Sequence, residues 1–153
     1  MKEIIAMHGW AGGGDQWSHW INSFQSSNWI WHSADRAYRH STPSMPNWTT
    51  TFHSKRFTRL AICHSLGSHL IANKVLSHAT HVVLVNSFSS FLPSGKESRS
   101  TIVALNGMIQ AIGTEKENSM ILKFQRKAHK PNKFDKKLTE LTYINLSNSG
   151  RLR

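Results

Sequence analysis

The chain has 153 residues, enough for one domain with a buried core. Hydrophobic residues make up 39% of it, and no apolar run approaches the roughly 18 residues that a membrane span needs, so we expect no membrane partner. The single cysteine, Cys63, excludes an internal disulfide and favours a cytoplasmic location. The net charge is +11, and ten basic residues follow position 115 against three acidic ones, which fits either an acidic partner or a solvated helical face.

The first half of the chain alternates short apolar runs with helical patterns. Residues 3–7 predict a buried strand that leads into a glycine-rich loop at 11–14. Asp15 is a suitable N-cap for a helix over 16–24, whose apolar side repeats at helical spacing. A short strand is expected at 29–31, and the proline-containing stretch 40–51 predicts a loop.

A second strand–helix–strand pattern follows. Residues 57–63 predict a strand that runs into His64-Ser65-Leu66-Gly67, followed by a helix to about residue 76. The β-branched run 81–86 is typical of a parallel strand covered on both faces. This alternation predicts an α/β fold with a mostly parallel sheet and helices on both sides of it.

Beyond residue 95 the pattern is helical. Apolar residues recur at helical spacing over 102–112 and 121–124, and a third candidate helix covers about 136–146. We therefore expect a core over 1–95 and a helical cap or lid segment over 96–153.

The segment Cys63-His64-Ser65-Leu66-Gly67 lies between a predicted strand and a predicted helix. A serine on such a sharp turn presents its hydroxyl above the carboxyl edge of the sheet, and the N–H of Leu66 is placed to donate to a developing oxyanion. The pattern departs from G-x-S-x-G because Cys63 replaces the first glycine. A plain Ser/Gly helix cap is the alternative interpretation.

A second motif, His8-Gly9-Trp10, follows the first predicted strand. In the hydrolase layout a loop of this kind supplies the other oxyanion donor, so the hole would consist of the Trp10 and Leu66 N–H groups. The two motifs stand in the required order about 55 residues apart. Trp10 is also a candidate to contact the substrate.

Other functional classes find little support. The glycine-rich loop matches neither a P-loop nor G-x-G-x-x-G, and the ten histidines form no metal-binding pattern, so we expect neither cofactor nor metal. No nucleic-acid-binding motif accompanies the positive charge, and we expect no nucleic-acid partner.

The residues that would complete a catalytic triad are not evident. The order should be Ser, then Asp or Glu, then His, but the only aspartate after Ser65 is Asp135, which follows His129. His129 also lies in a basic segment, a poor setting for a general base. We expect the strands that carry the acid and the base to be missing from this chain.

At these residues the sequence resembles the α/β-hydrolase superfamily over about 2–93. More narrowly, it is similar to the carboxylesterases that demethylate pimeloyl-acyl-carrier-protein methyl ester in biotin biosynthesis. That likeness rests on His8-Gly9-Trp10 with Trp17, on Ser65-Leu66-Gly67 and on Val85-Asn86-Ser87, followed by a basic helical segment.

The resemblance implies a serine carboxylesterase. Ser65 would attack an acyl ester carried on an acidic acyl carrier protein, and the basic cap would attract that carrier. The alternative is a truncated or degenerate hydrolase without turnover that acts at most as a binding module. In either case the apolar strand 81–86 would leave an open sheet edge, and we expect weak stability and self-association.

Overall fold

The computed structural model describes residues 1–38, 42–49, 57–92, 94–95, 98–128 and 130. The chain divides into two compact units, Met1–Phe88 and Ser89–Arg153. The boundary after Phe88 lies a few residues before the one expected from the sequence, which followed residue 95.

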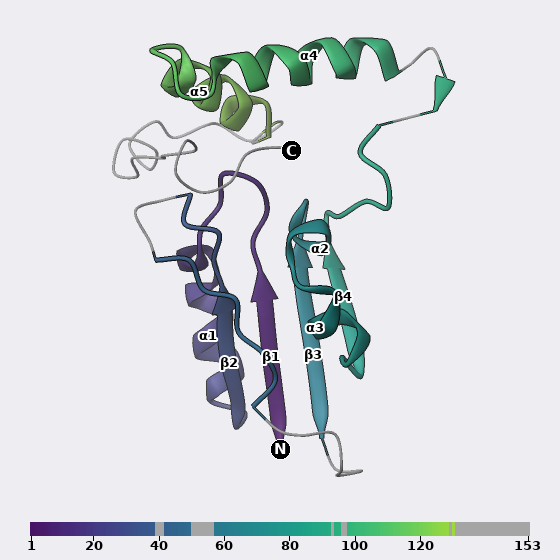
Figure 1. Cartoon of the computed structure of the whole chain (residues 1–153). Helices are drawn as coiled ribbons and strands as arrows, with labels where there is room; N and C mark the ends of the chain where they lie inside the picture. Colours follow the sequence, from purple (N-terminus) through teal and green to yellow (C-terminus); the bar gives the residue numbers. More distant parts are fainter. Residues whose placement is uncertain (39–41, 50–56, 93, 96–97, 129, 131–153) are drawn as a thin grey trace. The chain divides into compact units, whose positions relative to one another are not determined.

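The first unit is built on a parallel sheet of four described strands, in the order β2-β1-β3-β4 (Figure 1). The strands are β1 (Lys2–Met7), β2 (Trp29–Ala34), β3 (Thr58–His64) and β4 (His81–Val85). In register, Met7 lies opposite both Ala34 and Cys63, and His64 lies opposite Val85. All four strands therefore end at the same edge, and the predicted α/β class is confirmed.

Helices cover the two faces of this sheet separately. They are η1 (Gly14–Trp17), α1 (Ser18–Gln25), α2 (Gly67–Leu70) and α3 (Asn73–Ser77). On one face Ile5 and Met7 of β1 pack with Val75 of α3, and on the other Ile4 packs with Trp17. Successive β1 side chains point to opposite faces, so β1 contributes to both halves of the core.

The start of the first helical segment differs from the prediction. A 3-10 turn begins at Gly14 and contains Asp15, while the N-cap position is Gly13, which makes no side-chain capping bond. The carboxylate of Asp35 instead accepts the Gly14 N–H at 2.8 Å. Asp35 comes from the end of β2, so the cap is a tertiary contact that local sequence patterns cannot indicate.

The helix expected after Ser65 is broken in two. Ile71 and Ala72 have extended backbone (ψ 148° and 133°). As a result α2 ends at Leu70 after one turn, and α3 begins at Asn73. Val75 and Ile71 are still buried in the core. Neither residue at the break is a glycine or a proline, so the sequence contains no helix breaker that would predict it.

Strand β4 is the other difference. Its apolar run predicts burial on both faces, yet Val82, Val83 and Leu84 are 47%, 40% and 58% exposed. β4 is an edge of the described sheet, and the short α2 and α3 pack mainly under β1 and β3. An exposed apolar edge strand favours association.

From residue 98 onward, the described residues of the second unit are mainly helical. They form α4 (Ser98–Ala111) and α5 (Glu117–Ala128). The candidate helix at 136–146 lies outside the described residues, and placement of this unit as a lid remains a prediction. None of the described helices is long and apolar enough to cross a membrane.

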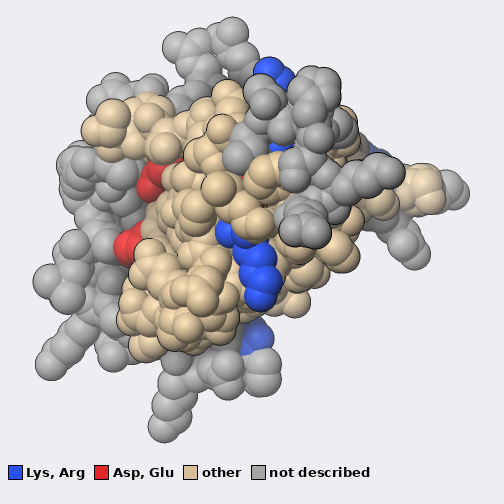
Figure 2. Space-filling view, turned by 90° about the horizontal axis from the view of Figure 1, so that it is seen from below, with Lys and Arg blue, Asp and Glu red and all other residues tan. Residues whose placement is uncertain are grey.

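Charge is unevenly distributed over the described surface. Figure 2 looks toward the end of the sheet where the strands begin, and the described atoms there are mostly uncharged, with few basic or acidic groups. In the second unit, a basic group of exposed residues lies on α5 and directly before it, comprising Lys116, Lys123, Arg126 and Lys127.

Cys63 gives a test of the core. It is fully buried at the end of β3, and burial raises the pKa of its thiol from 9.0 to about 11. The thiolate fraction near pH 8 is then about a hundredfold below that of an ordinary cysteine, and we expect reaction with a disulfide reagent to be slower by at least that factor. Unfolding in urea should restore an ordinary rate. Because the unfolded thiol ionises first, stability should fall as pH rises from about 9 to about 11. Fast labelling of the folded chain would show that the end of β3 opens to solvent.

Candidate active site

Ser65 lies on a tight turn between β3 and α2. Its φ is 52°, in the left-handed region that residues other than glycine seldom adopt. The Ser65 N–H donates to Val85 O at 2.9 Å, and the Ser87 hydroxyl donates to Ser65 O at 2.7 Å. These bonds from the end of β4 hold the unfavourable backbone in place. Strain of this kind is concentrated at functional sites.

The loop after β1 touches this turn. A Cβ placed on Gly9 would lie 2.9 Å from Ser65 Cβ and 3.2 Å from His64 O, so only glycine fits there. Trp10 is the next residue, so its N–H belongs to the peptide group that joins it to Gly9, the residue in contact with Ser65. Leu66 follows Ser65 and is the N-cap residue of α2. The structure therefore brings together the two sequence motifs that were predicted to form one site.

The order of the strands also places the Ser65 turn at a point where the chain changes direction across the sheet. From the central pair β1 and β3, the chain crosses to β2 on one side and to β4 on the other, with the intervening helices on opposite faces. The loops after β1 and β3 therefore diverge at their carboxyl ends. In open α/β sheets, ligands bind in the crevice formed at such a switch point. Gly9 and Ser65 lie in these two loops.

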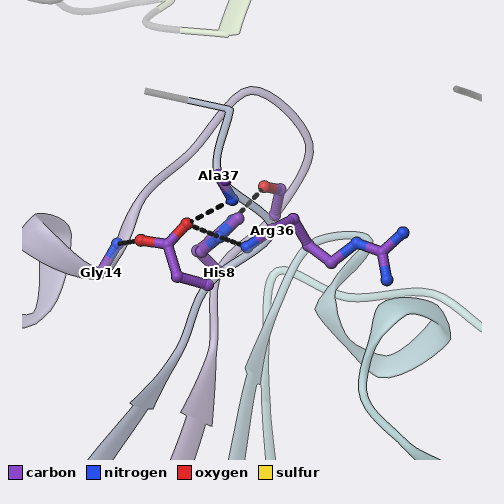
Figure 3. A network of polar contacts seen from close by, with 6 residues as sticks. His8, Gly14, Arg36 and Ala37 are labelled. Atoms are coloured by element: carbon purple, nitrogen blue, oxygen red, sulfur yellow. Dashed lines mark hydrogen bonds and ion pairs between the residues drawn. The ribbon is translucent and has the colours of Figure 1, made fainter. Parts of the chain in front are cut away.

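A buried polar network supports the loop after β1 (Figure 3). His8 is fully buried, and its Nε2 accepts the Arg36 N–H at 3.0 Å. Because Nε2 accepts this bond, Nδ1 is the ring nitrogen that donates, and it donates to Gly9 O at 2.7 Å. The ring thereby fixes the carbonyl of the residue that contacts Ser65.

Asp35 completes this network and was missed by the sequence analysis. Its Oδ1 accepts the Ala37 N–H at 2.7 Å and lies 3.3 Å from His8 Nε2, while Oδ2 accepts the Gly14 N–H. It therefore joins the loops that follow β1 and β2. In the sequence it is the sole acidic residue between positions 15 and 97, a position directly after a strand that could have drawn attention to it.

The other histidines near the turn have different surroundings. His69 Nε2 lies 3.0 Å from Phe88 O, and its ring stacks on Phe88. Burial lowers the pKa of His64 from its ordinary value of 6.5, so its ring is mainly neutral at pH 7. Among the described residues, the buried His64 Nδ1 has no hydrogen-bond partner. His8 and His69 thus use ring nitrogens for backbone contacts rather than for Ser65.

The remaining predicted candidates cannot be placed. His129 and Asp135 lie outside the described residues. Within the described part of the chain, no group of three or more His, Cys, Asp or Glu side chains could hold a metal ion. No protein-family model, curated protein or solved structure matches the chain.

The Asp35 network predicts a stability effect. Asp35→Ala removes the acceptor of two backbone N–H groups in a nearly buried setting, and we expect the free energy of unfolding to fall by about 3 kcal/mol. Asp35→Asn keeps one acceptor oxygen and should lie between parent and alanine variant. Urea denaturation measures all three. An alanine variant within about 0.5 kcal/mol of the parent would show that the network contributes nothing.

Proposed function

We propose that the chain is an α/β-hydrolase of the serine carboxylesterase type, with Ser65 as its nucleophile. The observation that carries the proposal is the positive φ of Ser65 directly after a central parallel strand, with the glycine of the other motif in contact with it. A strained strand–turn–helix serine at the carboxyl edge of a sheet is the arrangement of the hydrolase nucleophile elbow.

The oxyanion hole in this proposal consists of two backbone donors. The Leu66 N–H lies at the start of α2, and the Trp10 N–H lies in the loop that His8 fixes through Gly9 O. Donors held rigidly in this way stabilise a tetrahedral intermediate without reorganising. Support for rigidity comes from Gly67, whose missing Cβ allows α2 to start against the carbonyls of Met7 and His8.

The substrate class in this proposal is an acyl ester or thioester, extended to an acyl group on an acidic carrier protein. The net charge of +11 and the basic group at α5 support an acidic partner. Complementary charge of this kind accelerates encounter more than it strengthens the complex. Pimeloyl-acyl-carrier-protein methyl ester is the substrate suggested by the sequence resemblance.

A second candidate is a hydrolase-like chain without turnover. It is favoured by the histidines of the described site, since the His8 and His69 nitrogens bond backbone atoms. In this case the Ser65 site binds an acyl group or carbonyl but does not hydrolyse it.

Labelling with a fluorophosphonate, followed by peptide mass spectrometry, tests the assignment of Ser65. Even without a base, an oxyanion hole retains part of its acceleration, so Ser65 should react at least about tenfold faster than any other serine. Ser65→Ala should abolish the label. Ser68→Ala is the matched control, because Ser68 lies three residues further on, in α2, and its hydroxyl contacts that of Ser87; it should leave the label intact. Label spread evenly over exposed serines would refute the proposal.

A further inference from the structure

The second unit contains a hollow of its own between α4 and α5. Its volume is about 430 Å³. Its apolar lining comes from both helices, with Gly107, Met108 and Ala111 on α4 and Met120 and Phe124 on α5. Small-molecule sites usually have volumes of about 300–1,000 Å³ and are lined mainly by apolar side chains. The hollow is therefore large enough for a ligand.

The turn between the helices holds the two walls together. α4 ends at Ala111, and Gly113 follows with φ 77°, a conformation suited to glycine at a helix end. The Gly113 N–H donates to the Glu117 carboxylate, and the Thr114 hydroxyl donates to Ala111 O at 2.7 Å. The first bond ties the connecting turn to the first turn of α5, and the second ties it to the last turn of α4, so the turn is anchored to both helices.

The hollow is open at the middle of α4. A Cβ placed on Gly107 would have no atom within 4 Å, whereas one on Gly67 in the first unit would meet backbone at 2.6 Å. Gly107 is therefore not required by close packing. A side chain there would project into free space beside the apolar lining, and an apolar ligand can occupy the same space.

The charge on the rim is of one sign. Lys116, Lys123 and Lys127 line the hollow, and no acidic side chain is among its lining residues. Their spacing of seven and four residues places the three side chains along one side of α5. An apolar hollow bordered by three ammonium groups is complementary to a molecule with an aliphatic chain and an anionic head group.

We propose that this hollow between α4 and α5, from here on called the groove, binds a single-chain anionic amphiphile, such as a fatty-acid carboxylate. The chain lies between the Gly107–Met108 wall and the Met120–Phe124 wall, and the head group contacts the lysines. Burial of the chain contributes about 0.8 kcal/mol per methylene group, and the lysines select the charge of the head. The residues of this site all belong to the second unit, and the proposal does not depend on the esterase proposal.

Isothermal titration of the full chain with ligands below their micelle concentrations tests the proposal. Decanoate should bind saturably with one site per chain, and acetate should not bind. Decyltrimethylammonium, which has the same chain and the opposite charge, should bind at least about tenfold more weakly. Equal binding of the two decyl compounds would overturn the anionic preference, and binding of acetate as strong as that of decanoate would reduce the site to surface charge.

Methionine methyl resonances report where the ligand sits. Met108 and Met120 line the groove, whereas Met7 is buried in the core of the first unit and Met45 is exposed there. The fifth methionine, Met1, is exposed at the start of the first unit. With 13C-labelled methionine methyl groups, decanoate should shift the Met108 and Met120 signals and leave those of Met1, Met7 and Met45 in place. Shifts confined to Met7 or Met45 would place the ligand elsewhere and refute the proposal. Ser65→Ala should give the same pattern as the parent.

Two sets of variants complete the test. Gly107→Trp fills the groove and should weaken decanoate binding at least about tenfold, while Gly107→Ala should leave most of the affinity. Lys123→Gln with Lys127→Gln should weaken binding about threefold, and the matched control Lys74→Gln, on α3, should not change it. Unchanged binding in the Lys123/Lys127 double variant, or in a folded Gly107→Trp variant, would overturn the proposal.

Discussion

Gly67→Ala is expected to lower the free energy of unfolding by about 3 kcal/mol. A Cβ at this position would lie 2.6 Å from Met7 O and 3.1 Å from His8 O, and the third neighbour is the Met7 carbonyl carbon at 3.3 Å. All three are backbone atoms at the end of a central strand, so no side-chain rotation relieves the overlap. The only relief is to move α2 away from β1, which opens the core and displaces the Ser65 turn.

Gly107→Ala is the matched control for this prediction. The substitution is chemically the same, but it falls inside α4, where the added Cβ meets nothing within 4 Å. Alanine favours a helix over glycine by about 0.5–1 kcal/mol, so this variant should be neutral or slightly stabilised. Urea denaturation followed by circular dichroism measures both. Equal stability of the two variants would show that the close approach of α2 to β1 is not required by the fold.

The contrast between these glycines shows what sequence patterns can predict. A glycine two residues after a serine, at a strand–helix junction, predicts close packing, and Gly67 has it. Apolar runs predicted the strands, because a strand buried in a parallel sheet needs an apolar side chain on each face. The pairing of the Gly9 and Ser65 loops was expected from the hydrolase layout, and in the structure both loops leave adjacent parallel strands at the same edge.

Features that depend on distant partners were not predictable. Asp35 caps the turn at Gly14 from 21 residues away, and His8 fixes Gly9 O through a ring whose other nitrogen is held by Arg36. The Asp35–Gly14 and Arg36–His8 bonds are tertiary contacts between loops, and neither has a local sequence pattern. The expected burial of β4 on both faces was wrong for a related reason, although its position at an edge of the described sheet agrees with the open edge that was expected. An apolar run gives the preference of a strand for burial but not whether another element covers it.

Hydrolysis of p-nitrophenyl acetate by this chain is expected to be at least about a thousandfold slower than by an enzyme with a complete triad. A serine hydroxyl needs a neighbouring base to accept its proton at neutral pH. His8 bonds Gly9 O and Arg36 N, and His69 bonds Phe88 O. His64 is mainly neutral at pH 7 because burial lowers its pKa. It is, however, the last residue of β3 and precedes Ser65 directly in the chain, and its Nδ1 is buried.

Added imidazole should therefore raise the Ser65-dependent rate. A small base that diffuses to the turn replaces the missing acceptor, while the Trp10 and Leu66 donors would still stabilise the oxyanion. Imidazole also reacts directly with the ester, at the same rate in both samples. Subtracting the rate of Ser65→Ala from that of the parent, at equal imidazole concentration, removes this contribution. That difference should increase with imidazole concentration and with pH up to about 7, where imidazole becomes neutral. Robust Ser65-dependent turnover without imidazole would contradict this expectation, because it requires a base within the chain. His64→Gln and His129→Gln would then identify that base, since glutamine keeps a polar group of similar reach but cannot take up the proton.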